Sequence, residues 1–174
     1  MTEIKIYSTE IASPLGMLTL ASDGVSLTGL WFEGQKHFGG TFVQPFTERC
    51  DLPVFRSAEL WLKEYFAGRK PAPSALPLTL YGTEFQKKVW TLLGEIPYGE
   101  TVTYGWLAER VSELSGNAPC ARAIGGAVGK NPVSIILPCH RVVGMNGAMT
   151  GFAAGLERKR YLLSLENCLD KLMM

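Results

Sequence analysis

The sequence predicts a chain of two parts: an N-terminal α/β part and a mainly helical C-terminal part that contains a helix-turn-helix. Three observations support this fold class. Two short apolar segments separated by turn residues precede a helical apolar pattern that stops at Gly68. Three prolines then fall within residues 71–77, and three helical patterns follow between residues 83 and 130. Domains commonly contain roughly 100 to 200 residues, so a chain of 174 residues is long enough for one domain or two small ones.

The N-terminal part begins with alternating turn and strand signals. Residues 13–16 (SPLG) are a turn signal, and residues 17–21 form a short apolar strand. Residues 22–24 (SDG) form a second turn before a strand at residues 26–32, so the two strands are expected to pair as an antiparallel hairpin. A helix that covers one face of the sheet is then predicted, because apolar residues recur at helical spacing: Phe55, Ala58, Leu62, Tyr65 and Phe66.

A proline-rich segment separates the two parts. Residues 68–77 contain Pro71, Pro73 and Pro77 and few side chains suited to a core, which predicts a linker that ends in a short strand at residues 78–81. We therefore expect two domains, residues 1–81 including the linker and residues 82–174.

The C-terminal part starts with a well-marked helix. Thr83 and Gln86 fit a capping box, and the apolar stripe that follows extends to Ile96, where Pro97 stops the helix. A second helix is expected after Thr103 and a third near Pro119. Three short helices with a turn between the last two are typical of a helix-turn-helix, although other small helical cores share this pattern.

The third helix of this group has two unusual features. Arg122 lies near the helix start, where a cation does not complement the helix dipole, and Gly125 and Gly126 each cost about 1 kcal/mol relative to alanine. The first interpretation is a helix that approaches nucleic acid closely, with Arg122 reaching into a groove. The alternative is a tight contact between helices, with Arg122 in solvent.

The charge distribution is uneven. The formal net charge of +1 argues against a broad electrostatic grip on nucleic acid. Residues 114–156, however, contain Arg122, Lys130 and Arg141 and no Asp or Glu. This stretch could face a polyanion, or its three charges could simply belong to an apolar, glycine-rich core.

Composition excludes several other classes. No run approaches the roughly 20 apolar residues of a membrane span, and the first residues show no secretory signal, so we expect a cytoplasmic protein without membrane contact. The four cysteines show no paired spacing, and only His37 and His140 could supplement them as metal ligands. We therefore expect neither disulfides, nor a metal, nor a cofactor.

The strongest local signal is the segment Pro138-Cys139-His140-Arg141. Residues 133–137 are expected to form a short buried strand or extended segment that Pro138 ends, which leaves Cys139 at a turn as a candidate nucleophile. Adjacent side chains diverge, so His140 would reach the thiol through a turn or a water molecule. Three downstream carboxylates could orient His140, namely Glu157, Glu166 and Asp170. The alternative interpretation is a buried thiol beside a surface histidine.

Motifs across the C-terminal part resemble the O6-alkylguanine-DNA alkyltransferases, also called methylated-DNA-protein-cysteine methyltransferases. The resemblance implies an N-terminal α/β domain that is ribonuclease H-like and a C-terminal winged helix-turn-helix domain that carries the site. It covers residues 82–166 in order and is highly specific there, while the N-terminal part is only compatible with it. The matching segments are Gly82–Gln86, Trp90, Ile96–Thr101, Thr103–Gly105, Ala121–Gly125, Asn131-Pro132 and Pro138–Gly144.

This resemblance also implies a reaction and roles for individual residues. The alkyl group of O6-alkylguanine in DNA, with O4-alkylthymine as a further candidate, would pass irreversibly to Cys139 after the base is flipped out of the duplex, once per chain. His140 would deprotonate Cys139 through a water, and Glu166 would orient His140. Asn131 would brace this network, and Tyr104 would hydrogen-bond the guanine ring nitrogen and help the base to leave.

The resemblance further implies how DNA is bound. Arg122 would fill the gap left by the flipped base, from a helix in the minor groove of double-stranded alkylated DNA that Ala123 and Gly125 also approach. The protein would act as a monomer, and Val142, Phe152 and Ala153 would line the substrate pocket. Many members have Tyr at the position of Phe152 and Gly at that of Ala154, and residues 112–119 are slightly longer than usual. These departures leave the preferred alkyl size and the geometry of the turn open.

Two other functions fit parts of the pattern. A cysteine hydrolase or acyltransferase would also use Cys139 and His140, but it would need an oxyanion hole and would turn over repeatedly. A damage-binding module of the alkyltransferase-like type would lack the cysteine, so the presence of Cys139 argues against it.

Overall fold

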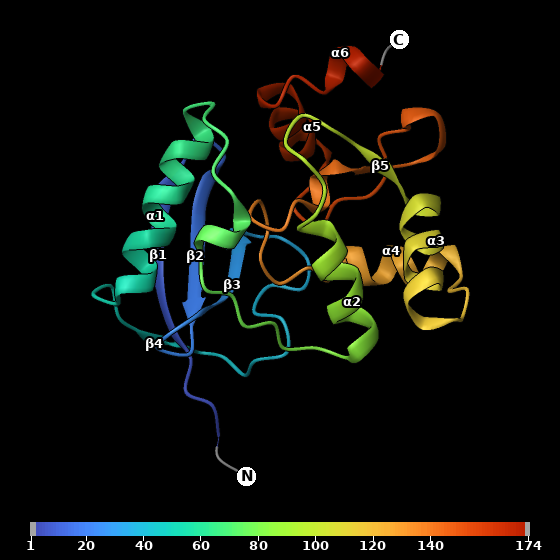
Figure 1. Cartoon of the computed structure of the whole chain (residues 1–174). Helices are drawn as coiled ribbons and strands as arrows, with labels where there is room; N and C mark the ends of the chain where they lie inside the picture. The colour runs from blue at the N-terminus through green and yellow to red at the C-terminus, as the bar shows by residue number, and fades with distance from the viewer. Residues whose placement is uncertain (1–2, 173–174) are drawn as a thin grey trace. The chain divides into compact units, whose positions relative to one another are not determined.

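A four-stranded sheet organises the first of two structural units, which comprises Met1–Tyr81 and Pro132–Ser134. The structure, a computed structural model, describes residues 3–172. The strand order is β3-β2-β1-β4 (Figure 1). The strands are β1 (Tyr7–Ser13), β2 (Gly16–Ser22), β3 (Leu27–Phe32) and β4 (Thr47–Glu48).

The antiparallel pairing of β2 with β3 confirms the expected hairpin. The strand β1 was not predicted, because Ser8, Thr9 and Glu10 interrupt the apolar pattern in it. It pairs antiparallel with β2 across a two-residue turn, and Gly16 supplies the left-handed backbone (φ 102°) that this turn requires. A local pattern missed β1 because the strand is ordered by its partner β2 rather than by apolar residues of its own.

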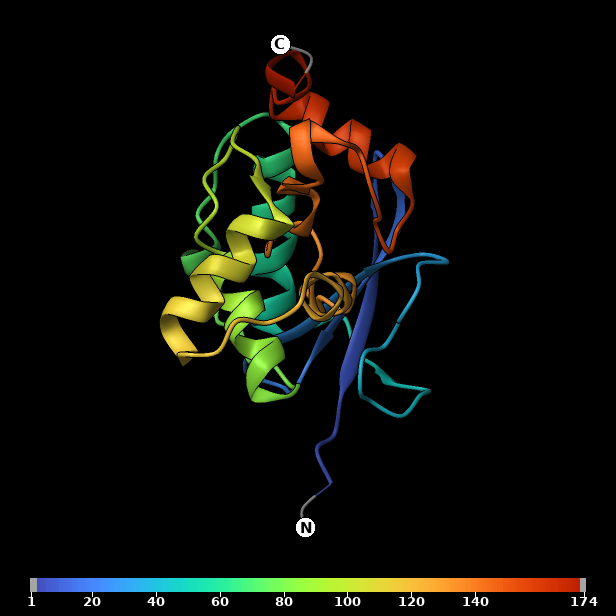
Figure 2. The same ribbon diagram turned by 90° about the vertical axis from the view of Figure 1, so that its right-hand side faces the viewer.

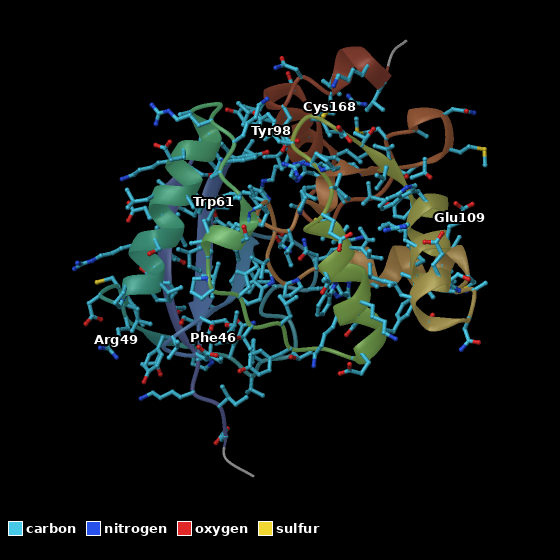
Figure 3. All side chains as sticks on the ribbon, in the orientation of Figure 1. Phe46, Arg49, Trp61, Tyr98, Glu109 and Cys168 are labelled. Carbon is cyan, nitrogen blue, oxygen red and sulfur yellow. The ribbon has the colours of Figure 1, made fainter. Side chains whose placement is uncertain are left out.

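The helix α1 (Pro53–Phe66) lies against β2 and β3 and confirms the predicted helix on one sheet face (Figure 1). It begins with Pro53 in its first turn and is followed by Gly68 at φ 82°. Trp61, labelled on α1 in Figure 3, stacks on Tyr65 with ring centroids 5.7 Å apart. Its indole Nε1 donates to the carbonyl oxygen of Ala72 at 2.8 Å. The proline-rich segment is therefore tied to α1 and includes a short 3-10 helix, η1 (Pro73–Ala75).

The strand predicted at residues 78–81 is wrong. Only an isolated parallel bridge joins Leu78 to Leu27, with the Leu27 amide donating to the Pro77 carbonyl at 2.8 Å and the Thr79 amide donating to the Leu27 carbonyl at 3.1 Å. Pro77 has no amide hydrogen to donate, which ends the ladder on the linker side. Further along β3, the amide and carbonyl of Leu30 hydrogen-bond Pro132 and Ser134 instead of residues 79–81.

Residues 133–137 are buried, as expected, but the expected strand or extended segment is wrong beyond Val133, because residues 134–137 form a turn and a bend. Val133 makes a single parallel bridge to Leu30 of β3, where the Leu30 amide donates to Pro132 and the Ser134 amide donates to Leu30. At Ile135 the backbone turns through φ 71°, which a β-branched residue adopts only under tertiary constraint.

The second unit, Gly82–Asn131 with Ile135–Met174, is mainly helical. The capping box at Thr83 and Gln86 is confirmed at the start of α2. The helix ends at Leu93, and residues 94–96 form a turn rather than more helix. The elements are α2 (Glu84–Leu93), β5 (Val102–Thr103), α3 (Tyr104–Ser115), α4 (Ala121–Gly129), η2 (Cys139–Arg141), β6 (Val142–Val143), η3 (Met145–Gly147), α5 (Leu156–Leu165) and α6 (Leu169–Leu172).

The three helices α2, α3 and α4 pack against one another, and Figure 2 shows α4 nearly along its axis. The Trp90 Nε1 of α2 donates to the Ala127 carbonyl of α4 at 2.8 Å, which ties these two helices together. In the part of the chain that the structure describes, no helix is both long and apolar enough to cross a membrane.

Candidate active site

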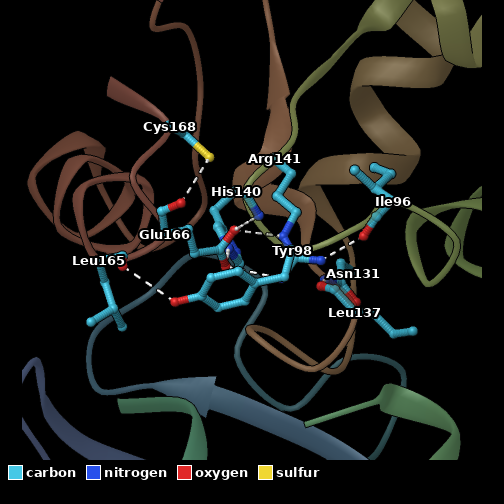
Figure 4. A network of polar contacts seen from close by, with 10 residues as sticks. Ile96, Tyr98, Asn131, Leu137, His140, Arg141, Leu165, Glu166 and Cys168 are labelled. Carbon is cyan, nitrogen blue, oxygen red and sulfur yellow. Dashed lines mark hydrogen bonds and ion pairs between the residues drawn. The ribbon is translucent and has the colours of Figure 1, made fainter. Parts of the chain in front are cut away.

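The turn that holds Cys139 is built from backbone hydrogen bonds. Cys139 begins the 3-10 helix η2 directly after Pro138, and the Arg141 amide donates to the Pro138 carbonyl at 3.0 Å. The Asn131 side chain, just after α4, donates to the Leu137 carbonyl at 2.7 Å (Figure 4). Cys139 is thus held at the start of a short, tightly braced helix, with 6% of its surface exposed.

The Cys139 thiol is neutral at rest. Burial raises its pKa, and this effect outweighs the opposing hydrogen bond from Asn131, the charge of Lys159 and the nearby amides of Cys139 and His140. A thiol is a poor nucleophile, so the site requires a base that removes the proton during the reaction.

His140 is the candidate for that base. Its Nε2 lies 2.8 Å from Glu166 Oε1, and both side chains are fully buried. Burial lowers the pKa of His140 more than the contact with Glu166 raises it, so the imidazole is neutral at physiological pH. Because the carboxylate accepts from Nε2–H, the other nitrogen, Nδ1, carries the lone pair that can take a proton.

Glu166 is ionised in this arrangement. Burial alone would raise its pKa, but the hydrogen bonds from His140 and Arg141 lower it to about 2. Of the other carboxylates considered from the sequence, Glu157 lies exposed in the first turn of α5, and the side chain of Asp170 is outside the described residues.

Arg141 is buried and does not face a polyanion, which corrects one interpretation of the acid-free stretch. Its Nε donates to Glu166 Oε2 at 2.8 Å and its Nη2 to Glu166 Oε1 at 3.0 Å. Its Nη1 donates to the Ile96 carbonyl at 2.5 Å. A buried guanidinium needs such partners, and they are supplied here by one carboxylate and one carbonyl.

Tyr104 is the first residue of α3, whose N-cap Thr103 accepts from the Trp106 amide at 3.0 Å. The phenol is half-buried, and its pKa is raised by burial, lowered by a hydrogen bond with Thr150 and raised again by the charge that Cys139 carries when ionised. These interactions place Tyr104 close to both Cys139 and Thr150, with its hydroxyl protonated at neutral pH.

Lys159 is a further charged group next to Cys139. This fully buried residue of α5 donates from its Nζ to the carbonyls of Val142 at 2.6 Å, Thr150 at 2.9 Å and Gly151 at 3.2 Å. Burial lowers its pKa to about 8, and the Cys139 charge opposes that shift. A lysine with this pKa is mostly charged at neutral pH, so Lys159 places a cation near the nucleophile. Its three hydrogen bonds also hold the loop after β6 in place.

The glycines of α4 lie on a face of the helix that nothing else in the described structure covers. A Cβ added at Gly125, Gly126 or Gly129 would meet nothing within 4 Å, and Arg122 is exposed on the first turn. The packing interpretation of these glycines, a tight contact between helices, is therefore wrong for the described residues. The glycines leave a surface that another molecule can approach.

The residues predicted to line the pocket lie on both sides of the loop after β6. Val142 is fully buried in β6, while Phe152 and Ala153 are partly buried just before α5. Among the described residues, no group of three or more His, Cys, Asp or Glu side chains could hold a metal ion.

Comparisons with known proteins match both units. The model described as 6-O-methylguanine DNA methyltransferase, DNA binding domain, matches residues 84–168, and that described as 6-O-methylguanine DNA methyltransferase, ribonuclease-like domain, matches residues 6–80. A methylated-DNA--protein-cysteine methyltransferase of Haemophilus influenzae is 44% identical over 161 residues, which are 92% of this chain and 86% of that protein. The chain belongs to the 6-O-methylguanine DNA methyltransferase family.

Two further relatives of this methyltransferase support the same family membership. The Methanosarcina acetivorans protein of the same name is 43% identical over 92% of this chain and 98% of its own length. The crystal structure of Mycobacterium tuberculosis OGT in complex with DNA is similar with a TM-score of 0.80 and 41% identity, over 96% of this chain and 98% of that chain.

The polar network of the methyltransferase joins several predicted site residues. Cys139, His140 and Glu166 are linked through the η2 turn and the end of α5, Asn131 braces the turn, and Tyr104 lies near the thiol. Within the described residues, Arg122, Ala123 and Gly125 of α4 take no part in this network. Their roles stay predictions.

Sequence reasoning missed Lys159 and the buried role of Arg141. A signal for Lys159 was present, because Lys159, Leu162, Leu163 and Glu166 are spaced along the inward face of one helix, where a lysine is unusual. For Arg141 no local signal existed, since its partner Glu166 lies 25 residues away.

Proposed function

We propose that this chain repairs alkylated DNA by moving the alkyl group of O6-alkylguanine irreversibly to its own Cys139, once per chain. The observation that carries this proposal is the buried Cys139 thiol beside a neutral His140 whose Nε2 is held by Glu166. Membership in the family, whose relatives are named for transfer from methylated DNA to a protein cysteine, supports the same reaction.

The proposed chemistry is a displacement at carbon. His140 takes the Cys139 proton at Nδ1 through a water, and the thiolate attacks the alkyl carbon, so that an S–C bond forms as the C–O6 bond breaks. The guanine anion leaves with a proton from the Tyr104 hydroxyl, and solvent returns the proton of His140 to Tyr104. The product thioether has no hydrolysable bond, which makes the transfer a single turnover.

Supporting residues fix the reactants. Asn131 holds the Leu137 carbonyl and contacts the thiol, which fits a bracing role. Val142, Phe152 and Ala153 form the pocket in which the flipped base is received. Phe152 presents an apolar ring without a hydroxyl, so it contributes shape rather than a hydrogen bond.

We further propose that residues 82–174 form the DNA-binding domain, a winged helix-turn-helix made of α3, α4 and the loop after β6. Arg122, Ala123 and Gly125 on the open face of α4 would enter the minor groove of double-stranded DNA. A monomer is sufficient, since one chain holds the whole network. A cytoplasmic location is part of this proposal, because Cys139 must stay a reduced thiol.

Counting methyl groups tests the reaction. An excess of duplex DNA with one radiolabelled O6-methylguanine is mixed with a known amount of protein, and label in protein is counted over time. We expect a plateau at about one methyl per chain, since the thiol is consumed. Label remaining in the DNA is counted in the same samples, and loss of more than one methyl from DNA per chain would instead indicate a cysteine hydrolase or acyltransferase and overturn the proposal.

A prediction for DNA binding concerns Arg122. In Arg122→Ala, we expect repair of duplex DNA to slow by about tenfold, because the flipped state loses the side chain that fills the gap and about 1.4 kcal/mol corresponds to that factor. Reaction with free O6-methylguanine base should change little. Single-turnover rates on both substrates measure the difference.

The matched control is Arg56→Ala, which removes an exposed arginine of α1 and should leave both rates unchanged. Equal losses on duplex and free base in Arg122→Ala would refute the proposed insertion into DNA.

A further inference from the structure

Glu166 lies at the centre of more contacts than a base-orienting carboxylate needs. Its Oε1 accepts from His140 Nε2 at 2.8 Å and from Arg141 Nη2 at 3.0 Å, and its Oε2 accepts from Arg141 Nε at 2.8 Å and from the Gly99 amide at 3.4 Å. Figure 4 shows the carboxylate between His140 and Arg141. The oxygen that holds the imidazole is therefore shared with a cation.

We propose that Arg141 is a positioning residue that holds His140 in its proton-accepting form, by sharing the Glu166 carboxylate with it. The proposal rests on the proposed roles of Cys139 and His140. Besides its structural contacts, Arg141 would thus help to keep His140 able to accept the proton of Cys139.

The geometry makes Arg141 a rigid partner. Its Nη1 donates to the Ile96 carbonyl in the turn after α2, and its guanidinium lies over the Tyr98 ring, 5.6 Å from the centroid. The Tyr98 hydroxyl donates to the Leu165 carbonyl at the end of α5 at 3.2 Å. The guanidinium is thus held from two elements, and the bidentate contact fixes both oxygens of Glu166.

The electrostatic effect of Arg141 on His140 has a definite sign. A carboxylate alone would favour imidazolium and raise the pKa of His140. Arg141 offsets part of that charge and lowers the pKa of His140, in the same direction as burial and Lys159. His140 therefore stays neutral at physiological pH and can accept a proton. The titratable groups that face the His140, Glu166 and Arg141 cluster are Cys139, Lys159, Tyr98 and Cys168.

The sharing of Glu166 by Arg141 and His140 also keeps the proton taken from Cys139 on the imidazole. Arg141 and His140 together lower the pKa of Glu166 to about 2, so the carboxylate does not take the proton from the imidazolium. Glu166 stabilises the transient imidazolium, and Arg141 limits how strongly it does so. Without Arg141 the same carboxylate would keep His140 protonated up to a higher pH.

The test compares Arg141→Gln and Arg141→Lys with the unchanged protein. Single-turnover methyl transfer from a methylated duplex is measured from pH 5 to 9, and the His140 pKa is followed by NMR of the imidazole. Only two histidines are present, and the exposed His37 serves as the internal reference. Arg69→Gln removes an exposed arginine, paired with Glu64, and is the control for loss of one charge.

We expect Arg141→Gln to move the acid limb of the rate profile and the His140 pKa upward by about one unit, because a cation next to the shared carboxylate is lost. Arg141→Lys keeps the cation without the bidentate contact and should shift both by less. Arg69→Gln should shift neither. Circular dichroism checks folding, and Arg141→Lys carries the comparison should Arg141→Gln not fold.

A loss of rate by the same factor at every pH, with an unchanged His140 pKa in both Arg141 variants, would show a merely structural role and overturn the inference. The proposed function is judged separately from the unchanged protein. If its transferred methyl maps to a residue other than Cys139, the proposed function fails, whatever the Arg141 variants do.

Discussion

Replacing Cys139 by alanine is expected to abolish methyl transfer completely. The displacement needs a sulfur nucleophile with a base beside it. The other buried thiol, Cys168, contacts the main-chain carbonyl of Glu166 at 3.9 Å, and burial raises its pKa to about 11, so it is a poor substitute for Cys139. Intact-mass measurement after incubation with O6-methylguanine DNA should show one added methyl on the unchanged protein and none on Cys139→Ala. Peptide mapping should place the methyl on Cys139.

The control for this experiment is Cys50→Ala. Cys50 is an exposed thiol between β4 and α1 in the first unit, and its removal should leave methyl transfer intact. The prediction also separates transfer from binding. If Cys139→Ala protects cells from alkylating agents as well as the unchanged protein does, damage binding suffices and the chemical assignment is wrong.

Replacing Lys159 by methionine is expected to cause the second largest effect. The carbonyls of Val142, Thr150 and Gly151 lose their common hydrogen-bond donor. The free energy of unfolding should therefore fall by about 3 kcal/mol, which corresponds to a drop in Tm of roughly 10 °C. The Cys139 thiolate also loses a nearby cation, which should slow transfer at neutral pH by about tenfold. Thermal unfolding and single-turnover rates measure the two effects.

The pH dependence of this variant follows from the charge of Lys159. Because the Lys159 pKa is about 8, the cation that assists the thiolate is present below that pH and is lost above it. The rate difference between the two proteins should therefore shrink above pH 8. Lys63→Met, which removes an exposed lysine paired with Glu59, is the control and should alter neither stability nor rate. An unchanged melting temperature in Lys159→Met would contradict the role of Lys159 in holding the loop after β6.

Helices were predicted well from the sequence because their signals are local. The capping box of Thr83 and Gln86, the N-cap Thr103 and the stop near Gly68 all depend on residues within one helical turn. Strands were predicted less well, since β1 and the expected strand at 78–81 depend on partners that the local pattern does not reveal.

The candidate site divides in the same way. The turn at Pro138 and Cys139 is visible in the sequence, because proline ends an extended segment and leaves a thiol behind it. Residue spacing left Glu157, Glu166 and Asp170 as alternatives, and the family resemblance implied Glu166. In the structure the Oε1 of Glu166 lies 2.8 Å from His140.

The sequence by itself determined the family, the helices of the C-terminal part and the segment that carries the thiol. Each of these is indicated by motifs of residues close together in the chain. Only the tertiary structure decided which charges are buried and paired. Arg141 and Lys159 look like surface cations in the sequence, yet both lie inside the second unit on acceptors distant in the chain. A buried charge is stable only where hydrogen-bonding partners lie next to it. Tertiary packing brings those partners together, and the spacing of residues in the sequence does not reveal them.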